Sequence, residues 1–433
     1  MAREVLNRRR MCRRDFLEVG AAGLLGMSIA DLLAAGSSAA GKGLRPARNC
    51  IFVWLAGGPA TIDIWDMKPD AANQIRGEFR PIATTAHGLG ICEHLPELAR
   101  VMNRCVLVRS VSHTLADHSP GTELVTTGHA PTPALAYPCV GSLATKLVKP
   151  HGGVPPYIVL GENAPAQSGF LSTSASPLRI VPADLSDRRV AAPVGLPDGF
   201  SVDDLGRRNV LRERLDRQFA AWDQTQVATE LSVFESRAMD ILRADKTRKA
   251  LDLRSEPQAI RDRYGNGWPG QALLAARRLV EAGVGFVTAS ISGWDTHTDN
   301  FGRLRSELLP QLDRALASLI GDLDQRGLLD DTLVYCAGEF GRTPNVNGAA
   351  GRDHWPRAMS VLLAGGSLRR GFVHGSTDKD GYEPESGTCS PADINATLLA
   401  LLGVAPQTTL RTPAGRPINV FGDGKSIGGI VRT

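Results

Sequence analysis

Short apolar runs alternate with longer amphipathic patterns along most of the chain. Apolar runs of strand length lie at 51–56, 106–108, 157–160, 285–291, 333–337 and 360–364. Patterns with helical spacing lie at 95–102, 272–283, 304–326 and 393–403, and a further helix is expected after Pro120 and Gly121, through Thr127 and Gly128. Nearly continuous apolar runs are typical of strands that are buried on both faces of a parallel sheet. The alternation therefore predicts an α/β fold, with a central, mostly parallel β-sheet flanked by helices.

Two regions depart from this alternation. Residues 151–200 are rich in Pro, Gly and Ser, so we expect long surface loops there, with one strand at 157–160. Residues 201–255 combine charged residues with Leu and Ala, which predicts a helical insertion that caps a site or forms a dimer face. Within 304–326, Pro310 is expected in the first turn of a helix, with the residues before it frayed.

The first 40 residues are typical of a targeting segment. The run CRRDFL from Cys12 to Leu17 resembles a twin-arginine export signal, and a weakly apolar run follows at 19–35. Asp31 would lie inside a membrane at a cost of a few kcal/mol, so no stable membrane span is expected. We expect the twin-arginine export machinery to carry the folded protein to the periplasm or outside the cell. The alternative is a basic, frayed N-terminal helix.

Length and composition narrow the class of protein further. The 433 residues suit one large α/β domain with an insertion, or two to three average domains. With 49 Lys and Arg against 45 Asp and Glu, the net charge is +4, and no basic patch is interleaved with aromatic residues. Nucleic-acid binding is therefore not expected. The seven cysteines form no CxxC pair, which argues against a cysteine-rich zinc module, although Cys92, Cys139 and Cys389 could form disulfides.

Acidic and histidine residues follow several predicted strands directly. Asp63 comes soon after the run at 51–56, and Asp295 and His297 come after the run at 285–291. The carboxyl ends of parallel strands meet at one edge of a sheet, where ligands bind. Carboxylate and imidazole groups both bind zinc or manganese, which predicts a metal site at this edge, although Asp63 could instead cap the next helix. After the run at 333–337, the polar groups at this edge are Glu339, Arg342, Asp353 and His354.

The densest group of polar residues in the chain runs from His113 to Glu123 and includes His118 and Ser119. Pro120 and Gly121 break this loop before a helix that is expected to run through Thr127 and Gly128. The free N–H groups and the partial positive charge of a helix N-terminus favour a bound anion and an activated side chain. Capping of the helix by Ser119 would explain the same pattern.

Several motifs resemble those of sulfatases and alkaline phosphatases. The run HSPGTELVTTG, from His118 to Gly128, is similar to the sulfatase signature C/S-x-P-x-R-x-x-x-x-T-G, and DINATLLALLG at 393–403 is similar to a late sulfatase helix. The segment 312–341 resembles a helix and strand that end in metal ligands in those enzymes. Over about residues 48–425, the runs GGPATIDIWDMKP, GWDTH, GEFGRTP and GRDHWP resemble a bacterial exported family catalogued as a domain of unknown function within the alkaline phosphatase and sulfatase superfamily.

This resemblance implies an alkaline-phosphatase-like sandwich over 48–425 and a set of metal ligands. Phe340 stands where the superfamily has a ligand, so Asp353 or His354 would supply the missing atom. His118 stands where sulfatases have the Cys or Ser that becomes formylglycine, and phosphatases a Ser or Thr. Three interpretations of His118 follow: it is the nucleophile, it is a metal ligand while water or Ser119 attacks, or catalysis has been lost. The implied ligands are Asp63, Asp295, His297, Glu339, Asp353 and His354.

We therefore expect an exported metal-dependent hydrolase of phosphate or sulfate esters. One or two divalent cations, Zn, Mn, Ca or Mg, would hold a small anionic ester or a sulfated or phosphorylated glycan. Arg342 would clamp the anion bidentately, or else form a surface salt bridge. His118 would protonate the leaving oxygen or carry the transferred group. The alternative is a non-catalytic exported protein that binds a glycan or a protein partner on the same fold.

Overall fold

The structure is a computed structural model, which describes residues 45–148, 154–171, 175–180 and 245–432. The expected export signal at 1–40 lies outside the described residues, as does most of the expected helical insertion at 201–255. The described end of that insertion contains helix α10 (Asp245–Leu251) and a 3-10 turn (Leu253–Ser255). Part of the expected loop region at 151–200 is likewise outside the described residues.

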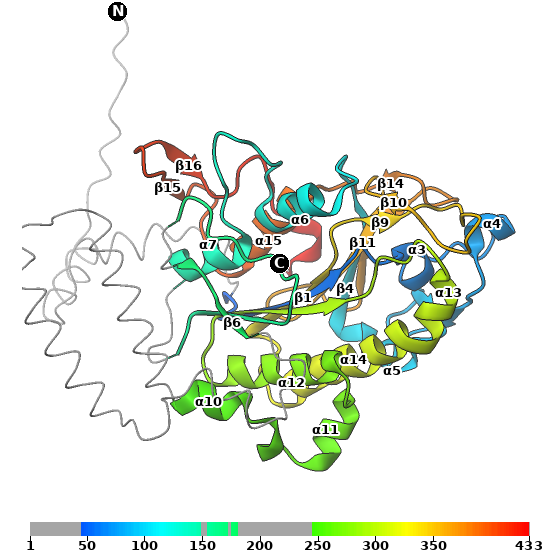
Figure 1. Cartoon of the computed structure of the whole chain (residues 1–433), viewed down its shortest axis with the longest axis horizontal. Helices are drawn as coiled ribbons and strands as arrows, with labels where there is room; N and C mark the ends of the chain where they lie inside the picture. The colour runs from blue at the N-terminus through cyan, green and yellow to red at the C-terminus, as the bar shows by residue number, and fades with distance from the viewer. Residues whose placement is uncertain (1–44, 149–153, 172–174, 181–244, 433) are drawn as a thin grey trace, which may run out of the picture. The chain divides into compact units, whose positions relative to one another are not determined.

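The described part of the chain is organised around an eight-stranded sheet (Figure 1). Its strand order is β12-β4-β11-β8-β1-β7-β5-β6. In that order the strands are β12 (Phe372–His374), β4 (Cys105–Val111), β11 (Met359–Ala364), β8 (Thr332–Ala337), β1 (Asn49–Ala56), β7 (Phe286–Ser292), β5 (Tyr157–Leu160) and β6 (Leu178–Ile180).

Strand β1 lies at the centre of this sheet. It pairs in parallel with β7, where Cys50 is opposite Phe286, and with β8, where Cys50 is opposite Leu333. Among the described strands of the sheet, β11 alone is antiparallel to both of its neighbours, β4 and β8. The carboxyl ends of β1, β7 and β8 therefore meet at one edge, as the sequence pattern predicts.

Side chains alternate between the two faces of the sheet because successive residues of a strand point in opposite directions. On β1, Ile51, Val53 and Leu55 enter one core cluster, whereas Cys50, Phe52 and Trp54 enter the other. The first core is covered by α5 (Pro96–Ala99), α11 (Gln258–Tyr264), α12 (Trp268–Glu281) and α14 (Leu309–Gln325), together with α10. The second is covered by α6 (His118–Thr127), α7 (Val140–Leu147) and α15 (Pro391–Leu401) (Figure 1). The predicted α/β fold is thus confirmed.

Short elements complete the described structure. The helical ones are α3 (Thr61–Ile64), α4 (Asn73–Arg76), α13 (Asn300–Arg303), a π-helical turn (Leu304–Leu308) and 3-10 turns at Met102–Arg104 and Gly428–Ile430. Two-stranded antiparallel ribbons pair β2 (Pro81–Ala83) with β3 (Gly90–Cys92), β9 (Gly341–Arg342) with β10 (His354–Trp355), β13 (Ser376–Thr377) with β14 (Pro384–Ser386), and β15 (Thr409–Arg411) with β16 (Pro417–Asn419).

Two details of the sequence interpretation can be compared with this structure. Pro310 lies in the first turn of α14, as predicted, but the residues before it are not frayed, because α13 and the π-helical turn continue directly into α14. The six described cysteines, which include Cys92, Cys139 and Cys389, are all buried and unpaired. Within the described ranges, no helix has both the length and the apolar character needed to cross a membrane.

Candidate functional site

A cluster of histidine and carboxylate side chains lies at the edge where β1, β7 and β8 end. Asp295 follows β7, Glu339 follows β8, and His354 begins β10. His118 is the first residue of α6, which packs against the same end of the sheet. The structure thus brings together residues that are far apart in the sequence, because the strands that precede them are neighbours in the sheet.

The Asp295 carboxylate is the centre of this cluster. Its Oδ2 atom lies 3.3 Å from Nε2 of His118, and its Oδ1 atom lies 3.1 Å from Nε2 of His297 and 3.3 Å from Nε2 of His354. One ligand atom from each of His118, Asp295 and His354 can be chosen so that all three atoms lie within 4.8 Å of one another. Three imidazole Nε2 atoms therefore converge on a single carboxylate.

The opposite ring nitrogen of each imidazole is held by another acceptor. The Nδ1 atom of His118 lies 2.6 Å from Oε1 of Glu339, and that of His297 lies 2.7 Å from Oδ1 of Asp353. The Nδ1 atom of His354 lies 2.6 Å from the backbone oxygen of Ala116. Histidines that bind metals characteristically donate one ring N–H to a carboxylate or carbonyl, which orients the other nitrogen toward the ion. All three side chains have this arrangement.

The contacts of His354 show which of its two ring nitrogens carries the proton. A carbonyl oxygen only accepts hydrogen bonds, so Nδ1 of His354 carries the proton that binds Ala116. Burial lowers the pKa of His354, and the nearby charge of Arg342 lowers it further. The hydrogen bond to Ala116 raises this pKa, but the net shift is downward. Neutral His354 therefore presents a lone pair at Nε2, which lies 2.9 Å from Nε2 of His297 and faces the Asp295 carboxylate.

The Nε2 lone pair of His354 and the Asp295 carboxylate lie close together, and a positive charge between them would stabilise this arrangement. A divalent cation would satisfy the imidazole nitrogens and the Asp295 oxygen at once. Mixed nitrogen and oxygen ligands favour zinc or manganese, whereas magnesium and calcium prefer oxygen alone. The described residues therefore fit a metal site centred on His118, Asp295 and His354, with His297 beside it.

Arg342 holds Asp295 in place from inside the protein. Its guanidinium donates to Oδ1 of Asp295 at 2.5 Å, to the backbone oxygen of Gly58 at 2.7 Å and to that of Arg352 at 3.0 Å. Burial alone would raise the pKa of Asp295, but the hydrogen bond and charge of Arg342 lower it to about 2. The carboxylate is therefore ionised at neutral pH and available to a cation.

The position of Arg342 corrects the two roles that the sequence suggested. Its side chain is 0% exposed, so it cannot clamp an anion arriving from solvent, and it is not a surface salt bridge. Burial lowers the pKa of Arg342. The hydrogen bond to Asp295 acts in the opposite direction, but the net shift is downward. We assign Arg342 a positioning role, because it joins the ends of β1 and β7 to the Asp295 carboxylate.

Glu339 supports His118 from beneath the cluster. Its side chain is 3% exposed and accepts the backbone N–H of Gly57 at 3.0 Å as well as Nδ1 of His118. The backbone oxygen of Glu339 accepts from Nε2 of His113, whose Nδ1 accepts the N–H of Leu115. Burial lowers the pKa of His113 to about 4 despite that hydrogen bond to Glu339, so His113 is neutral and acts as a fixed donor.

Asp63 takes part in a different set of contacts. Its carboxylate accepts Nε and a terminal nitrogen of Arg352, each at 2.7 Å, and the side-chain amide of Asn300 at 2.9 Å. Asp63 is 1% exposed and Arg352 0% exposed. The predicted ligand role does not fit this position because both oxygens are engaged in a buried ion pair. The helix-cap alternative is not seen either, because α3 has no side-chain cap.

Ser119 and Phe340 lie next to His118, one at the start of α6 and the other beneath the cluster. Ser119 is exposed beside His118 in the first turn of α6, and it does not cap this helix, whose N-cap residue is Asp117. The buried ring of Phe340 lies with its centroid 5.2 Å from that of His118 and 4.3 Å from that of His354. Phe340, which replaces an expected ligand, therefore forms an apolar base beneath the imidazoles.

Sequence reasoning assigned no role to three residues that shape this site. Arg352, the partner of Asp63, lies directly before Asp353 in the run GRDHWP, so its position was a usable signal. Ala116 contributes only its backbone oxygen, for which a sequence gives no signal. His113 lies within the polar run before α6, but nothing in the sequence indicates that it contacts Glu339.

The fold is similar to several solved structures, all at low sequence identity. One is the lipoteichoic acid synthase LtaP from Listeria monocytogenes, with a TM-score of 0.39 and 11% identity over 87% of this chain and 74% of that one. Another is the PsFucS1 sulfatase from Pseudoalteromonas sp., with a TM-score of 0.37 and 12% identity over 92% and 73%. A mutant TAB5 alkaline phosphatase gives a TM-score of 0.36 and 12% identity over 84% and 100%. Likenesses this distant carry no inference about activity.

Comparison at the level of sequence gives a clearer assignment. No curated protein sequence matches this chain. The model of the family described as "Protein of unknown function (DUF1501)" matches residues 47–431, which include every member of the histidine and carboxylate cluster. The resemblance to a domain-of-unknown-function family is thereby confirmed. The chain belongs to the DUF1501 family.

Proposed function

We propose that this protein is a metal-dependent hydrolase of phosphate or sulfate esters. The observation that carries the proposal is the convergence of the Nε2 atoms of His118, His297 and His354 on the Asp295 carboxylate. A divalent cation bound there would polarise an ester oxygen and lower the pKa of a bound water. Glu339 and Asp353 orient the imidazoles, so their proposed role is to hold the ligands in place.

The surroundings of the cluster favour an anionic substrate. His118 begins the ten-residue helix α6, and the free N–H groups at a helix N-terminus favour a negatively charged group. Arg303 lies close by and donates to the backbone oxygen of Gly293 at 2.8 Å and to that of Asp295 at 3.4 Å. These positive groups would stabilise a phosphate or sulfate beside the cation. The ester would therefore be held by its anionic end.

The contacts of His118 distinguish among the roles considered for it. With Nδ1 directed to Glu339 and Nε2 to Asp295, both ring nitrogens are engaged within the cluster. This supports a ligand role for His118 and leaves a water molecule or the exposed Ser119 hydroxyl as the attacking group. A nucleophilic imidazole would first have to turn away from Asp295.

The first experiment measures metal content and turnover in the same preparations. Wild type and Asp295→Asn are purified, and their Zn, Mn, Mg and Ca are measured by elemental analysis. Both are then assayed on an aryl phosphate, an aryl phosphodiester and an aryl sulfate. We expect a stoichiometric transition metal and turnover in the wild type, and loss of both in Asp295→Asn. The matched control is His87→Gln, because His87 is an exposed histidine outside the cluster. A full metal complement in Asp295→Asn would contradict the proposed site.

A second candidate is a cation-binding protein without turnover. This candidate is favoured by His118, because sulfatases and alkaline phosphatases have a hydroxyl or thiol nucleophile at the position that His118 resembles. The same experiment separates the two, because a stoichiometric metal with no hydrolysis of any of the three ester classes would support the binding protein. Its ligand would then be a glycan or a protein partner.

We also propose that residues 1–40 direct export by the twin-arginine route. This route moves folded proteins, and the six described cysteines are buried thiols that do not depend on an oxidising compartment to form disulfides. Changing Arg13 and Arg14 together to Lys should retain the protein inside the cell. Export of this variant at the wild-type level would contradict the proposal.

A further inference from the structure

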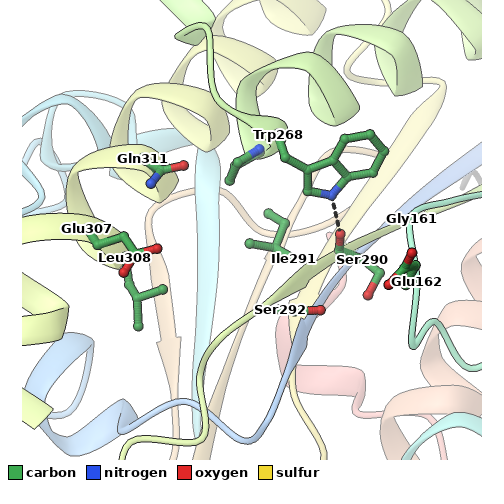
Figure 2. A pocket seen from close by; sticks show the side chains of 10 residues that line it. Gly161, Glu162, Trp268, Ser290, Ile291, Ser292, Glu307, Leu308 and Gln311 are labelled. Atoms are coloured by element: carbon green, nitrogen blue, oxygen red, sulfur yellow. Dashed lines mark hydrogen bonds between the residues drawn. The ribbon is translucent and has the colours of Figure 1, made fainter. Parts of the chain in front are cut away.

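A cavity of about 320 Å³ lies at the carboxyl ends of β5 and β7 (Figure 2). Its apolar wall is formed by Trp268, Ile291 and Leu308. Figure 2 shows Glu307 and Leu308 on one side and Glu162 on the other, with Trp268 and Ile291 between them. In an open α/β sheet, cavities beyond the carboxyl ends of the strands are the usual ligand sites.

The aromatic wall of this cavity is fixed in position. The indole N–H of Trp268 donates to the backbone oxygen of Ser290 at 2.7 Å, which ties the ring to β7. On the β5 side, Gly161 has a φ of +94°, and a Cβ atom there would lie 2.9 Å from Cζ2 of Trp268. The ring therefore contacts the end of β5 so closely that a side chain is excluded. Trp268 remains half-buried, so part of its surface is available to a ligand.

The opposite wall comes from the π-helical turn at Leu304–Leu308. Pro310 has no N–H to donate to the preceding turn, and a widened turn accommodates its ring. The turn directs Leu308 into the core, where it is 6% exposed, and leaves Glu307 exposed at the mouth of the cavity. Turns of this kind are rare and are often found at functional sites.

The charges around the cavity are negative. Among the described residues, its lining includes Glu162 and Glu307 but no lysine, arginine or histidine. Arg303, a basic side chain near Leu308, donates instead to the backbone oxygens of Gly293 and Asp295, on the side of the cluster. Two carboxylates repel a phosphate or sulfate and attract a cation, and the face of an indole ring adds to the attraction.

We propose that this cavity binds an organic ammonium group, held by the Trp268 ring and the carboxylates of Glu162 and Glu307. The backbone links it to the cluster, because Ser292 lines the cavity and Asp295 follows three residues later, a span of at most roughly 10 Å. A Cβ atom at Gly293 would lie 3.3 Å from Cδ2 of Leu308, so the cavity wall touches this connecting segment. This inference rests on the proposed function: the preferred phosphate or sulfate ester carries an ammonium group on its alcohol part.

Choline and its uncharged isostere 3,3-dimethylbutan-1-ol provide a direct test, because they share a shape and differ in charge. Binding of each to the full-length protein is measured by calorimetry. We expect the wild type to bind choline at least about tenfold more tightly than the isostere, which is the discrimination that a desolvated cation–π contact with nearby carboxylates can supply. Equal binding of the two compounds, or no binding of choline, would overturn the proposal.

Variants then test the residues. Glu162→Gln with Glu307→Gln removes both charges at exposed positions, where the fold should be unaffected, and we expect about tenfold weaker binding of choline with unchanged binding of the isostere. Trp268→Leu should weaken both compounds. The control is Glu383→Gln, which removes an exposed carboxylate paired with Arg357, away from the cavity lining. Wild-type affinity for choline in the double glutamate variant would overturn the assignment.

A kinetic comparison tests whether the cavity binds part of the ester during hydrolysis. The kcat/KM values of phosphocholine and of the phosphate ester of 3,3-dimethylbutan-1-ol are compared in wild type and in the double glutamate variant. We expect a preference for phosphocholine that is lost in the variant. An active enzyme without this preference would overturn the connection between the cavity and the ester. Failure of all hydrolysis would instead count against the proposed function, because choline binding is measured without turnover.

Discussion

The Nδ1 atom of His118 lies 2.6 Å from Oε1 of Glu339, and the same carboxylate accepts the backbone N–H of Gly57. This pair joins the first residue of α6 to the ends of β8 and β1. Because Glu339 is buried and held from two sides, it fixes both the orientation of the His118 ring and the proton on Nδ1. The Nε2 atom is thereby directed at Asp295.

Changing Glu339 to Gln tests this relationship. The amide has one accepting oxygen in place of a carboxylate, so His118 and Gly57 would compete for it, and the imidazole would be held less firmly. We expect about 10- to 100-fold weaker metal affinity, which is the usual effect of losing a group that orients a histidine ligand. Competition with a chelator of known affinity measures it.

The control for Glu339→Gln is Glu383→Gln, an exposed carboxylate outside the cluster. Unchanged affinity in Glu339→Gln would show that His118 is not oriented by Glu339. Complete loss of the metal, equal to that in Asp295→Asn, would indicate that Glu339 itself is a ligand, as the family resemblance implied.

Asp63→Ala should separate stability from metal binding. The substitution leaves the guanidinium of Arg352 buried without its carboxylate partner, and such a loss costs about 3–5 kcal/mol in the free energy of unfolding. Because Asp63 contacts Arg352 and Asn300, we expect the folded variant to keep its metal. Denaturant unfolding and elemental analysis of the same sample measure the two effects. Loss of metal from a stably folded variant would restore the ligand role for Asp63.

Asp313 on α14 predicts a dependence of stability on pH. It is 3% exposed and accepts the backbone N–H groups of Glu97 at 3.0 Å and Leu98 at 2.6 Å. Burial raises the pKa of its carboxyl to about 6, although these hydrogen bonds lower it. The folded protein therefore holds this proton more tightly than the unfolded chain, and the contribution of Asp313 to stability falls as the pH rises from about 4 to about 6.

The measurement is the difference between wild type and Asp313→Asn in the free energy of unfolding at several pH values. We expect this difference to change across pH 4 to 6, in the direction that favours the wild type at the acidic end, because the amide does not ionise. A difference that stays constant over that range would mean that the carboxyl titrates normally.

The buried cysteines predict a slow reaction with alkylating reagents. Burial raises the pKa of Cys92, Cys105 and Cys389 to about 12, so the reactive thiolate is scarce at pH 8. We expect iodoacetamide to leave the six described cysteines unmodified in the folded protein and to modify all six in guanidinium chloride. Mass spectrometry of peptides measures both. Rapid labelling of Cys92 in the folded protein would contradict its buried position.

The sequence predicted the central sheet because its strands are buried on both faces and read as continuous apolar runs, such as 333–337. It also placed Asp295, His297 and His354 at one edge, since residues that follow neighbouring parallel strands must meet there. The structure brings these three side chains together. For Asp295 and His297, what made this possible is that a short segment after a strand has little freedom to leave the sheet edge.

Side-chain partners were harder to predict than positions. Asp63 and Arg342 both follow strands at the correct edge, yet each is engaged in buried contacts. A carboxylate and a guanidinium that meet inside a protein come from segments remote in sequence, so local pattern does not reveal the pair. The cavity at Trp268 was not predicted for the same reason, because Glu162 and Glu307 come to line one cavity only in the folded chain.

The central place of β1 also determines when this protein can fold during its synthesis. Cys50 leaves the ribosome early, but its partners Phe286 and Leu333 follow much later. At about 5–20 residues per second, the interval before β8 emerges is roughly 15–60 s. Until β7 emerges, shortly before β8, the apolar run from Ile51 to Ala56 has no neighbouring strand on either side. The newborn chain is therefore a natural client for chaperones that bind exposed apolar segments, and truncated chains that lack β7 and β8 should aggregate.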